Sequence, residues 1–240
     1  MEKETFVYYE TLKNRYPNVR ILTWKKEFNY SAINNFAVRE ARGEYLLFLN
    51  NDVEIITESW LEEMLQLCQQ KDVGMVGAKL YYPDDTIQHA GVVVGLGGVA
   101  AHVLCKLPRD AEGYMGRLRC VQEISAVTAA CMMVKTSVFK AVGGFDEELK
   151  VAFNDIDLCM KVRKYGVKIV FTPYAELYHY ESKSRGMEDT PEKQLRFSRE
   201  VNCFRRKWER ELLKGDPYYN PNLTLNNTDC SLRKQEKNGD

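Results

Sequence analysis

The stretch that decides the fold is YLLFLNND, residues 45–52. It begins with five apolar residues, which are too few for a typical helix and about right for a fully buried strand. Two amides and a carboxylate follow at once, at the carboxyl end of the predicted strand, where open α/β sheets bind their ligands. Asp52 is a hard oxygen ligand suited to Mg²⁺ or Mn²⁺. The alternative is that residues 50–52 only cap the following helix, as Asn and Asp often do.

Helix and strand patterns alternate on both sides of this strand. Before it, the pattern predicts a helix over 4–15, a strand over 19–24 and a helix over 32–42. After it come a predicted helix over 57–70 and a strand over 73–80. This order of elements predicts an α/β fold with a mixed, mostly parallel sheet flanked by helices.

The second half of the chain continues the sheet and ends in a long helix. Further predicted elements are strands at 91–95, 121–127, 130–135, 167–171 and 175–180, and helices at 136–142, 155–165 and 190–213. We expect Pro173 to end the strand over 167–171. The tail over 215–240 is rich in Pro, Asn and charge, which predicts an extended segment.

Composition excludes several classes of protein. With 34 Lys and Arg against 34 Asp and Glu, the formal net charge is +0, so no global field favours nucleic acid. The seven cysteines form no CxxC pair, which indicates reduced thiols in the cytoplasm rather than a disulfide framework or a zinc site. The N-terminus has no signal-peptide pattern. The most apolar run, over 90–105, is shorter than the roughly 18 residues that span a bilayer.

Residues 95–100, GLGGVA, match the dinucleotide-binding pattern G-x-G-x-x-A. That fingerprint requires a helix after the glycines. Pro108 and Gly113 follow soon afterwards, in a segment without helical periodicity. The segment therefore favours a glycine-rich hairpin or loop.

Two acids, Asp155 and Asp157, open the predicted helix over 155–165. Residues two apart do not share a helical face, so at most one of them points at a given site. Asp155 is the candidate general base, because a carboxylate within hydrogen-bond reach can take the proton of an attacking hydroxyl. The alternative is that both acids only interact favourably with the helix dipole.

His179 ends a predicted strand and is one of three histidines in the chain. A histidine there suits Mn²⁺ as well as it suits packing. We expect its ligand atom to lie within roughly 4–5 Å of that of Asp52, if both bind one ion. The following segment, SKSRG at 182–186, offers hydroxyls and cations for a diphosphate. His89 and His102 are weaker candidates, because no acidic residues accompany them in the sequence.

Ten motifs, taken in order, cover the chain from about residue 5 to its end. They are FNYS (28–31), NN (34–35), GEY (43–45), NND (50–52), IQHAG (87–91), TAAC (128–131), GGFDE (143–147), NDIDLC (154–159), HYES (179–182) and DPYYNP (216–221). As an ordered set they resemble the inverting glycosyltransferases of the family-2 type, which have the GT-A fold. Within that family, the resemblance is to rhamnosyltransferase-like and galactosyltransferase-like enzymes of bacterial surface polysaccharide synthesis.

The resemblance implies transfer of a sugar from a UDP- or dTDP-linked donor to a hydroxyl of a glycan or lipid-linked acceptor. It implies Asp155 as general base, and Asp52 with His179 as ligands of Mn²⁺ or Mg²⁺. Donor contacts are implied for Asn29, Asn34, Asn50, Asn51, Ser182 and Arg185. Acceptor contacts are implied for Thr128, Gly144, Phe145, Asp146 and Asn154.

The chain also departs from the family pattern. Asn50 stands where the family has its first metal-binding acid, and Asn154 stands where it has a Glu or Asp. The family opens with strands that hold the nucleoside, and nothing before Phe6 matches them. We therefore expect a catalytic domain over 1–189, in which the nucleotide-binding half, 1–80, lacks its N-terminal strands and 81–189 forms the acceptor side. A helix and tail follow over 190–240, and the open sheet edge is expected to favour self-association.

Two other functions stay open at this point. A sugar-1-phosphate nucleotidyltransferase shares the general fold, but it would need a basic, glycine-rich phosphate loop that the sequence does not show. A non-catalytic remnant that binds a glycan or a partner is the second.

Basic residues at 205, 206, 207 and 210, beside Phe204 and Trp208, also offer contact with anionic lipid at the inner face of the plasma membrane. The simpler interpretation is a solvated helix face.

Overall fold

The computed structural model describes residues 3–181 and 190–234 of the 240-residue chain. Its helices are α1 (Lys3–Arg15), α2 (Tyr30–Glu40), α3 (Trp60–Cys68), α4 (Thr136–Ala141), α5 (Asn154–Tyr165) and α6 (Pro191–Lys214), with 3₁₀ turns η1 (Leu96–Gly98) and η2 (Tyr114–Arg119). Its strands are β1 (Tyr45–Leu49), β2 (Val53–Ile55), β3 (Val73–Tyr81), β4 (Ile87–His89), β5 (Val92–Val94), β6 (Ala100–His102), β7 (Gln122–Glu123), β8 (Cys131–Lys135) and β9 (Lys168–His179).

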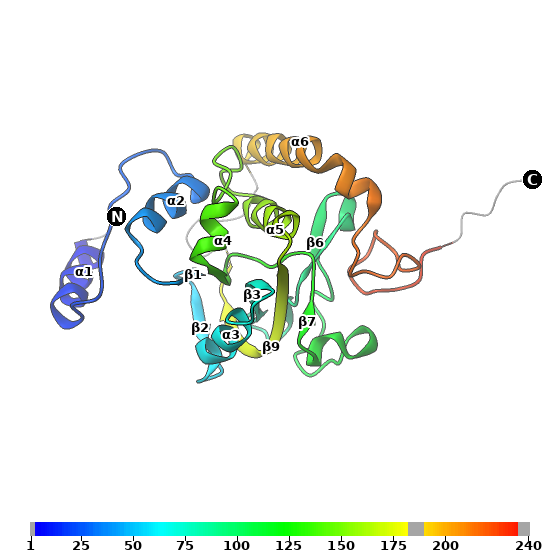
Figure 1. Cartoon of the computed structure of the whole chain (residues 1–240), viewed down its shortest axis with the longest axis horizontal. Helices are drawn as coiled ribbons and strands as arrows, with labels where there is room; N and C mark the ends of the chain where they lie inside the picture. Colours follow the sequence, from blue (N-terminus) through cyan, green and yellow to red (C-terminus); the bar gives the residue numbers. More distant parts are fainter. Residues whose placement is uncertain (1–2, 182–189, 235–240) are drawn as a thin grey trace, which may run out of the picture.

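One mixed sheet organises these elements, with strand order β1-β8-β3-β9-β2. Figure 1 shows β1, β2, β3 and β9 near the centre of the view, with α6 across the top. Strands β1, β3 and β9 run in the same direction, and β3 and β9 pair in parallel. Strand β8 lies antiparallel between β1 and β3, and β2 is antiparallel to β9. The prediction of a mixed α/β sheet flanked by helices is confirmed. The insertion of β8 could not be predicted, because it pairs strands that are distant in sequence.

Helices cover both faces of the sheet. Trp60, Met64 and Cys68 of α3 pack on one face, against β3, β8 and β9. Helices α4 and α5 pack on the other face, where Val162 joins the larger core. All nine residues of β3 are buried, whereas burial alternates along β1. The prediction of a fully buried strand at 45–49 is therefore wrong, because Leu46 and Phe48 face the larger core whereas the other face of β1, with Tyr45 and Leu47, is only partly covered.

Two predicted strand features are also wrong. Residues 19–24 form no strand, because no described strand lies beside them to complete a ladder; their side chains are half-buried or exposed. Pro173 does not end a strand, since β9 continues through it to His179. The pairing with β3 shifts register here, from Gly77 opposite Phe171 to Lys79 opposite Glu176. Pro173 falls within this irregularity, where its missing N–H costs no ladder bond.

The glycine-rich segment is a hairpin, as the sequence predicts. Strands β5 and β6 pair antiparallel across the η1 turn, so no helix follows the glycines. Gly95 and Gly97 have φ angles of 98° and 65°, which glycine adopts without steric cost. The hairpin places His102 at the end of β6, opposite Val92.

The C-terminal part of the chain packs onto this core. Thr190 caps α6 by accepting the backbone N–H of Lys193 at 3.4 Å. The following residues 215–234 contain no regular helix or strand, yet Tyr219, Leu223 and Cys230 are buried. Asp216 accepts the Val94 N–H and the Ser125 hydroxyl, which ties the tail to the hairpin side of the molecule.

Candidate functional site

The register of the last strand pair brings Asp52 and His179 together. Val53 of β2 lies opposite His179 of β9, and the Tyr180 N–H donates to the Asp52 carbonyl at 2.8 Å. Asp52 Oδ1 lies 3.2 Å from His179 Nε2, closer than the roughly 4–5 Å expected for two ligands of one ion. Both side chains are largely buried. Two residues separated by more than a hundred positions therefore meet at one edge of the sheet.

Gln88 on β4 fixes the orientation of the His179 ring. Its side-chain N–H donates to the His179 carbonyl at 3.2 Å, which leaves Gln88 Oε1 to accept from His179 Nδ1 at 2.7 Å. A neutral ring with its proton on Nδ1 presents the lone pair of Nε2 to Asp52. Asp52 Oδ1 is buried and accepts no hydrogen bond. The Asn50 amide, 3.1 Å from Nε2, can donate to the imidazole lone pair, so the atom without a partner among the described residues is Asp52 Oδ1, which a cation or a proton would satisfy.

Asp52 and His179 fit a divalent cation whose other ligands come from a bound substrate and water. Among the described residues, no group of three or more His, Cys, Asp and Glu could hold a metal. A carboxylate and an imidazole leave most coordination positions free, and Mg²⁺ commonly fills such positions with substrate phosphates and water. Asn50 Nδ2 lies 3.1 Å from His179 Nε2, so Asn50 contacts the same point. Asn51 is exposed.

A short loop between β7 and β8 connects this pair to the candidate base. The Ala129 N–H donates to Asp155 Oδ2 at 3.1 Å, and the Asn50 N–H donates to the Ala130 carbonyl at 3.0 Å. Tyr30 donates its hydroxyl to the Ala129 carbonyl at 3.2 Å. Burial and the nearby Asp155 charge raise the Tyr30 pKa above its usual value, so its hydroxyl stays protonated.

Asp155 and Asp157 face different parts of the molecule. Phe153 precedes them with φ 61°, a left-handed conformation that is uncommon for a phenylalanine and lies at the start of the helix. Asp157 is completely buried and accepts the Trp208 indole N–H at 2.8 Å. The Lys207 ammonium of α6 lies 2.7 Å from Asp157 Oδ1. Asp157 therefore joins α5 to α6.

His89 and His102 also belong to this region, although no acidic residue stands near them in the sequence. Their Nδ1 atoms lie 2.9 Å apart, and the Thr128 N–H points at His89 Nε2 at 3.4 Å. The charges of Asp155 and of Glu181 act on His102. The sequence near the two histidines holds no acidic residues, but the fold brings the charges of α5 and of the end of β9 to act on His102. The IQHAG motif, which contains Gln88 and His89, was the signal available for His89.

The remaining predicted donor residues have local roles in this structure. Asn29 caps α2 by accepting the Ala32 N–H at 3.0 Å, and its amide donates to the Glu147 carbonyl. Asn34 donates to the Tyr30 carbonyl one turn earlier at 2.9 Å. Ser182 and Arg185 lie outside the described residues. Donor contact stays a prediction for all of these residues.

The predicted acceptor residues separate into two groups. Thr128 lies beside His89 and next to the loop N–H that binds Asp155. The others are held within the fold. The Phe145 ring packs on Phe48, and the Phe145 backbone forms hydrogen bonds with the Asn35 amide. The Gly144 carbonyl accepts from Lys161, and Asp146 pairs with Lys207. Asn154 is buried and donates to the Val151 carbonyl. Acceptor contact at these positions stays a prediction.

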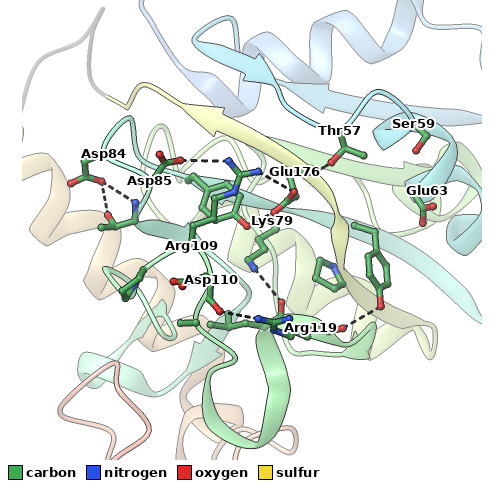
Figure 2. Close-up of a pocket in the computed structure, with 17 residues that line it drawn as sticks. Thr57, Ser59, Glu63, Lys79, Asp84, Asp85, Arg109, Asp110, Arg119 and Glu176 are labelled. Carbon is green, nitrogen blue, oxygen red and sulfur yellow. Dashed lines mark hydrogen bonds and ion pairs between the residues drawn. The ribbon is translucent and has the colours of Figure 1, made fainter.

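A cleft of about 1130 Å³ lies farther along β9, away from these residues. Figure 2 shows Arg109 between Asp85 and Glu176, with N···O distances of 3.5 and 3.3 Å. Lys79 donates to the Leu118 carbonyl at 3.2 Å, and burial lowers the Lys79 pKa. The cleft thus carries charges of both signs that largely pair with each other. None of the predicted site residues lines it.

The aromatic residues of α6 face inward. Phe204 and Trp208 are buried in the core beside α5, whereas the sequence left open that they contact lipid. Arg205 donates to the Gly98 carbonyl, and Lys207 pairs with Asp146 and Asp157. This arrangement favours the interpretation of α6 as a packed helix with a solvated face. None of the helices within residues 3–181 and 190–234 is long and apolar enough to cross a bilayer.

Comparison with protein families identifies the chain. Residues 12–200 match the model of the family described as "Glycosyltransferase like family". The chain belongs to this family. A protein of Sinorhizobium fredii, the uncharacterised y4gI, is 53% identical over 97% of this chain, and the O-antigen biosynthesis protein RfbC of Myxococcus xanthus is 42% identical over 93%. The chain spans only 26% and 17% of the lengths of these two proteins.

Solved structures of glycosyltransferases share the fold. The mannosyltransferase PcManGT of Pyrobaculum calidifontis, in complex with GDP-Man and Mn²⁺, gives a TM-score of 0.58 at 15% identity, over 87% of this chain and 52% of that one. GalNAc-T7 with UDP, GalNAc and Mn²⁺ gives 0.63 at 14% identity, over 88% and 40%. At this identity the likeness is one of fold, and it agrees with the predicted GT-A class.

Proposed function

We propose that this chain transfers a sugar from a nucleoside-diphosphate sugar to a hydroxyl of a glycan or lipid-linked acceptor, with inversion at the anomeric carbon. One observation carries the proposal. In a member of a glycosyltransferase-like family, Asp52 pairs with His179, and the Ala129–Ala130 backbone links Asn50, two residues before Asp52, to Asp155. The names of RfbC and of the two solved structures support O-antigen-type glycans and nucleotide-linked donors.

Asp52 and His179 would hold a divalent cation, Mn²⁺ or Mg²⁺. The fit rests on Asp52 Oδ1, which is buried and has no hydrogen-bond partner among the described residues, and on the His179 imidazole that Gln88 and Asn50 hold beside it. Such a cation would offset the negative charge that develops on the departing diphosphate. Asn50, which contacts the same point, would replace an acid with a neutral amide and so leave one fewer negative charge there.

Asp155 would act as the general base. It accepts the N–H groups of Ala129 and Ile156, which fix the position of its carboxylate. An ionised carboxylate has about four lone-pair positions, so it can still accept the acceptor hydroxyl. The proton of the acceptor hydroxyl passes to Asp155 while the hydroxyl oxygen bonds to the anomeric carbon. The bond from that carbon to the diphosphate oxygen breaks at the same time, which inverts the configuration.

The test measures product release and binding separately. The chain is incubated with UDP-, dTDP- and GDP-linked sugars and an extract of bacterial lipid-linked glycans, with and without Mn²⁺. We expect Mn²⁺-dependent release of a nucleoside diphosphate from at least one donor. Pyrophosphate formation from a nucleoside triphosphate and a sugar phosphate would instead indicate a nucleotidyltransferase.

Calorimetric titration of UDP, dTDP and GDP with Mn²⁺ tests the cation site. Asp52→Ala and His179→Ala should lose the Mn²⁺-dependent part of the binding. Asp72→Ala, at an exposed ion pair with Lys168, is the matched control and should bind like the wild type. If a folded wild-type chain neither releases a nucleoside diphosphate nor binds a nucleotide, the proposal is refuted. That result would favour a non-catalytic binding role.

A further inference from the structure

Buried His89 and half-buried His102 are joined by a hydrogen bond. His89 ends β4 and is completely buried, and His102 ends β6. Their Nδ1 atoms are 2.9 Å apart, with the rings at 81° to each other. The other nitrogen of His89, Nε2, lies 3.4 Å from the Thr128 backbone nitrogen. The proposed reaction at Asp155 does not use either ring.

The position of each proton follows from these contacts. A backbone N–H can only donate, so His89 Nε2 must accept from Thr128 with its lone pair. A neutral His89 ring then carries its proton on Nδ1 and donates it to His102 Nδ1. His102 Nδ1 is therefore the acceptor, and a neutral His102 ring carries its proton on Nε2. The opposite assignment would place the His89 N–H against the Thr128 N–H.

Burial supports neutral rings at both positions. It lowers the pKa of His89 well below the usual value, and the neighbouring His102 lowers it further. Burial also lowers the pKa of His102, although the charges of Asp155 and Glu181 act in the opposite direction. Around neutral pH the pair therefore holds one N–H···N bond between the two rings and one further N–H, on His102 Nε2, that points away from His89.

The outward N–H lies in the region of the candidate base. Within the described part of the chain, no hydrogen bond uses His102 Nε2. The two groups that act on the ring with negative charge are Asp155, on α5, and Glu181, after β9. Thr128, whose N–H anchors His89, is followed directly by the Ala129 N–H that holds Asp155. One loop thus fixes both the candidate base and the histidine pair.

We propose that His102 binds a hydroxyl oxygen of the acceptor sugar through Nε2–H, and that His89 locks it in the tautomer that can donate. This proposal rests on the proposed function and names a group that recognises the acceptor. A carboxylate such as Asp155 can only accept from a sugar hydroxyl. A neutral N–H donor in the region fixed by the same loop can donate to a lone pair of a hydroxyl oxygen without adding a charge that would pair with the base. His102 is thus a binding residue, and His89 is a positioning residue.

The first test reads the tautomers directly and needs no substrate. The chain contains three histidines, so long-range ¹H–¹⁵N spectra of ¹⁵N-histidine-labelled protein can be assigned with His179→Ala and His102→Gln. We expect His89 protonated on Nδ1 and His102 on Nε2 at pH 7. His89→Leu should convert His102 to a mixture of tautomers, whereas His89→Asn, which can still donate near the Nδ1 position, should preserve the Nε2–H form. His102 protonated on Nδ1 in the wild type would overturn the locked pair.

The second test uses two substitutions of similar size. In His102→Gln the amide N–H can reach the former Nε2 position, whereas in His102→Asn it reaches only the Nδ1 position. With the donor and acceptor that support transfer, we expect the first variant to stay within about threefold of wild type. The second should lose roughly tenfold in acceptor kcat/KM, the usual worth of one hydrogen bond. Donor hydrolysis without acceptor should be equal in all three proteins.

The two tests separate failure of this role from failure of the proposed function. Equal acceptor kcat/KM for the Gln and Asn variants, or a parallel loss of donor hydrolysis, would refute hydroxyl binding by His102. A folded wild type that neither transfers nor hydrolyses any donor would refute the proposed function and, with it, the acceptor role. The ¹⁵N spectra would still decide whether the pair is locked.

Discussion

The two sides of α5 differ in how they use a carboxylate. On the sheet-edge side, Asp155 accepts two backbone N–H groups and no side-chain cation. On the α6 side, two residues later, Asp157 is fully buried among Lys161, Lys207 and the Trp208 indole. Backbone bonds orient a carboxylate and leave lone pairs free for a ligand. The Asp157 carboxylate is instead enclosed by charge and packing: Lys207 and the indole contact Oδ1, and the Lys161 ammonium lies 3.3 Å from Oδ2. The difference indicates that the first acid serves chemistry and the second serves packing.

The strongest test of this comparison is Asp155→Asn. The substitution keeps the shape of the side chain and removes its ability to take a proton. We expect transfer to fall by roughly 10²–10⁴-fold, the usual worth of a general base. The unfolding free energy in urea and the binding of nucleoside diphosphate with Mn²⁺ should stay close to wild type. A large loss of stability in this variant would mean that Asp155 is the structural acid.

Asp157→Ala should show the opposite result. The substitution leaves the Lys207 and Lys161 ammonium groups without their shared buried partner. Removing one member of a buried ion pair typically costs about 3–5 kcal/mol. We expect a loss of this size in the unfolding free energy measured in urea, with transfer per folded molecule close to wild type.

The control is an ion pair of similar geometry on the surface. Asp72 and Lys168 lie 2.7 Å apart, but both side chains are exposed. Solvent and side-chain entropy cancel most of the benefit of such a pair. Asp72→Ala should therefore leave stability nearly unchanged. Similar losses for Asp72→Ala and Asp157→Ala would show that burial does not distinguish the two sides of the molecule.

A smaller effect is expected from Gln88→Leu, on the sheet-edge side. Gln88 does not touch the proposed cation; it holds His179 through the ring Nδ1 and the carbonyl. Loss of such a supporting bond typically weakens metal affinity by 10–100-fold. We expect a loss in that range for Mn²⁺, measured by calorimetry, with a modest change in stability. Unchanged Mn²⁺ affinity would mean that the His179 ring is oriented without Gln88.

Local patterns predicted most of the elements, because helix periodicity and caps are encoded within a few residues. Thr190 and Pro191 at the start of α6 are an example. The position of β1 could not be predicted in this way. Its five apolar residues fit a central strand, but β8, from more than eighty residues later, pairs with one side of it and sets its place in the sheet. Strand order depends on contacts between segments that are distant in sequence.

The candidate site was predictable to a similar degree. Asp52, Asp155 and His179 could be chosen because each is a ligand or a base at the end of a predicted element. Gln88 and His102 could not, since an amide and a histidine within a glycine- and valine-rich segment carry no chemistry until their partners are known. Gln88 bonds a residue 91 positions later. Supporting groups of this kind become visible only in three dimensions.

The last prediction concerns Asp146, at the border of the α6 side. Burial alone would raise the Asp146 pKa, but hydrogen bonds from Lys207 and the Glu148 N–H, with the charges of Lys207 and Lys161, outweigh it and lower the pKa. An unperturbed Asp titrates near pH 3.9. A carboxylate with a lowered pKa in the folded state stabilises the fold above that pH and loses this contribution as pH falls through the folded value. Asp146→Asn should therefore be less stable than wild type by a constant amount above about pH 5, and the difference in unfolding free energy should shrink below about pH 4. Urea unfolding at a series of pH values measures it, and a difference that stays constant down to pH 3 would contradict the assignment of Asp146 as a charged contact between the loop and α6.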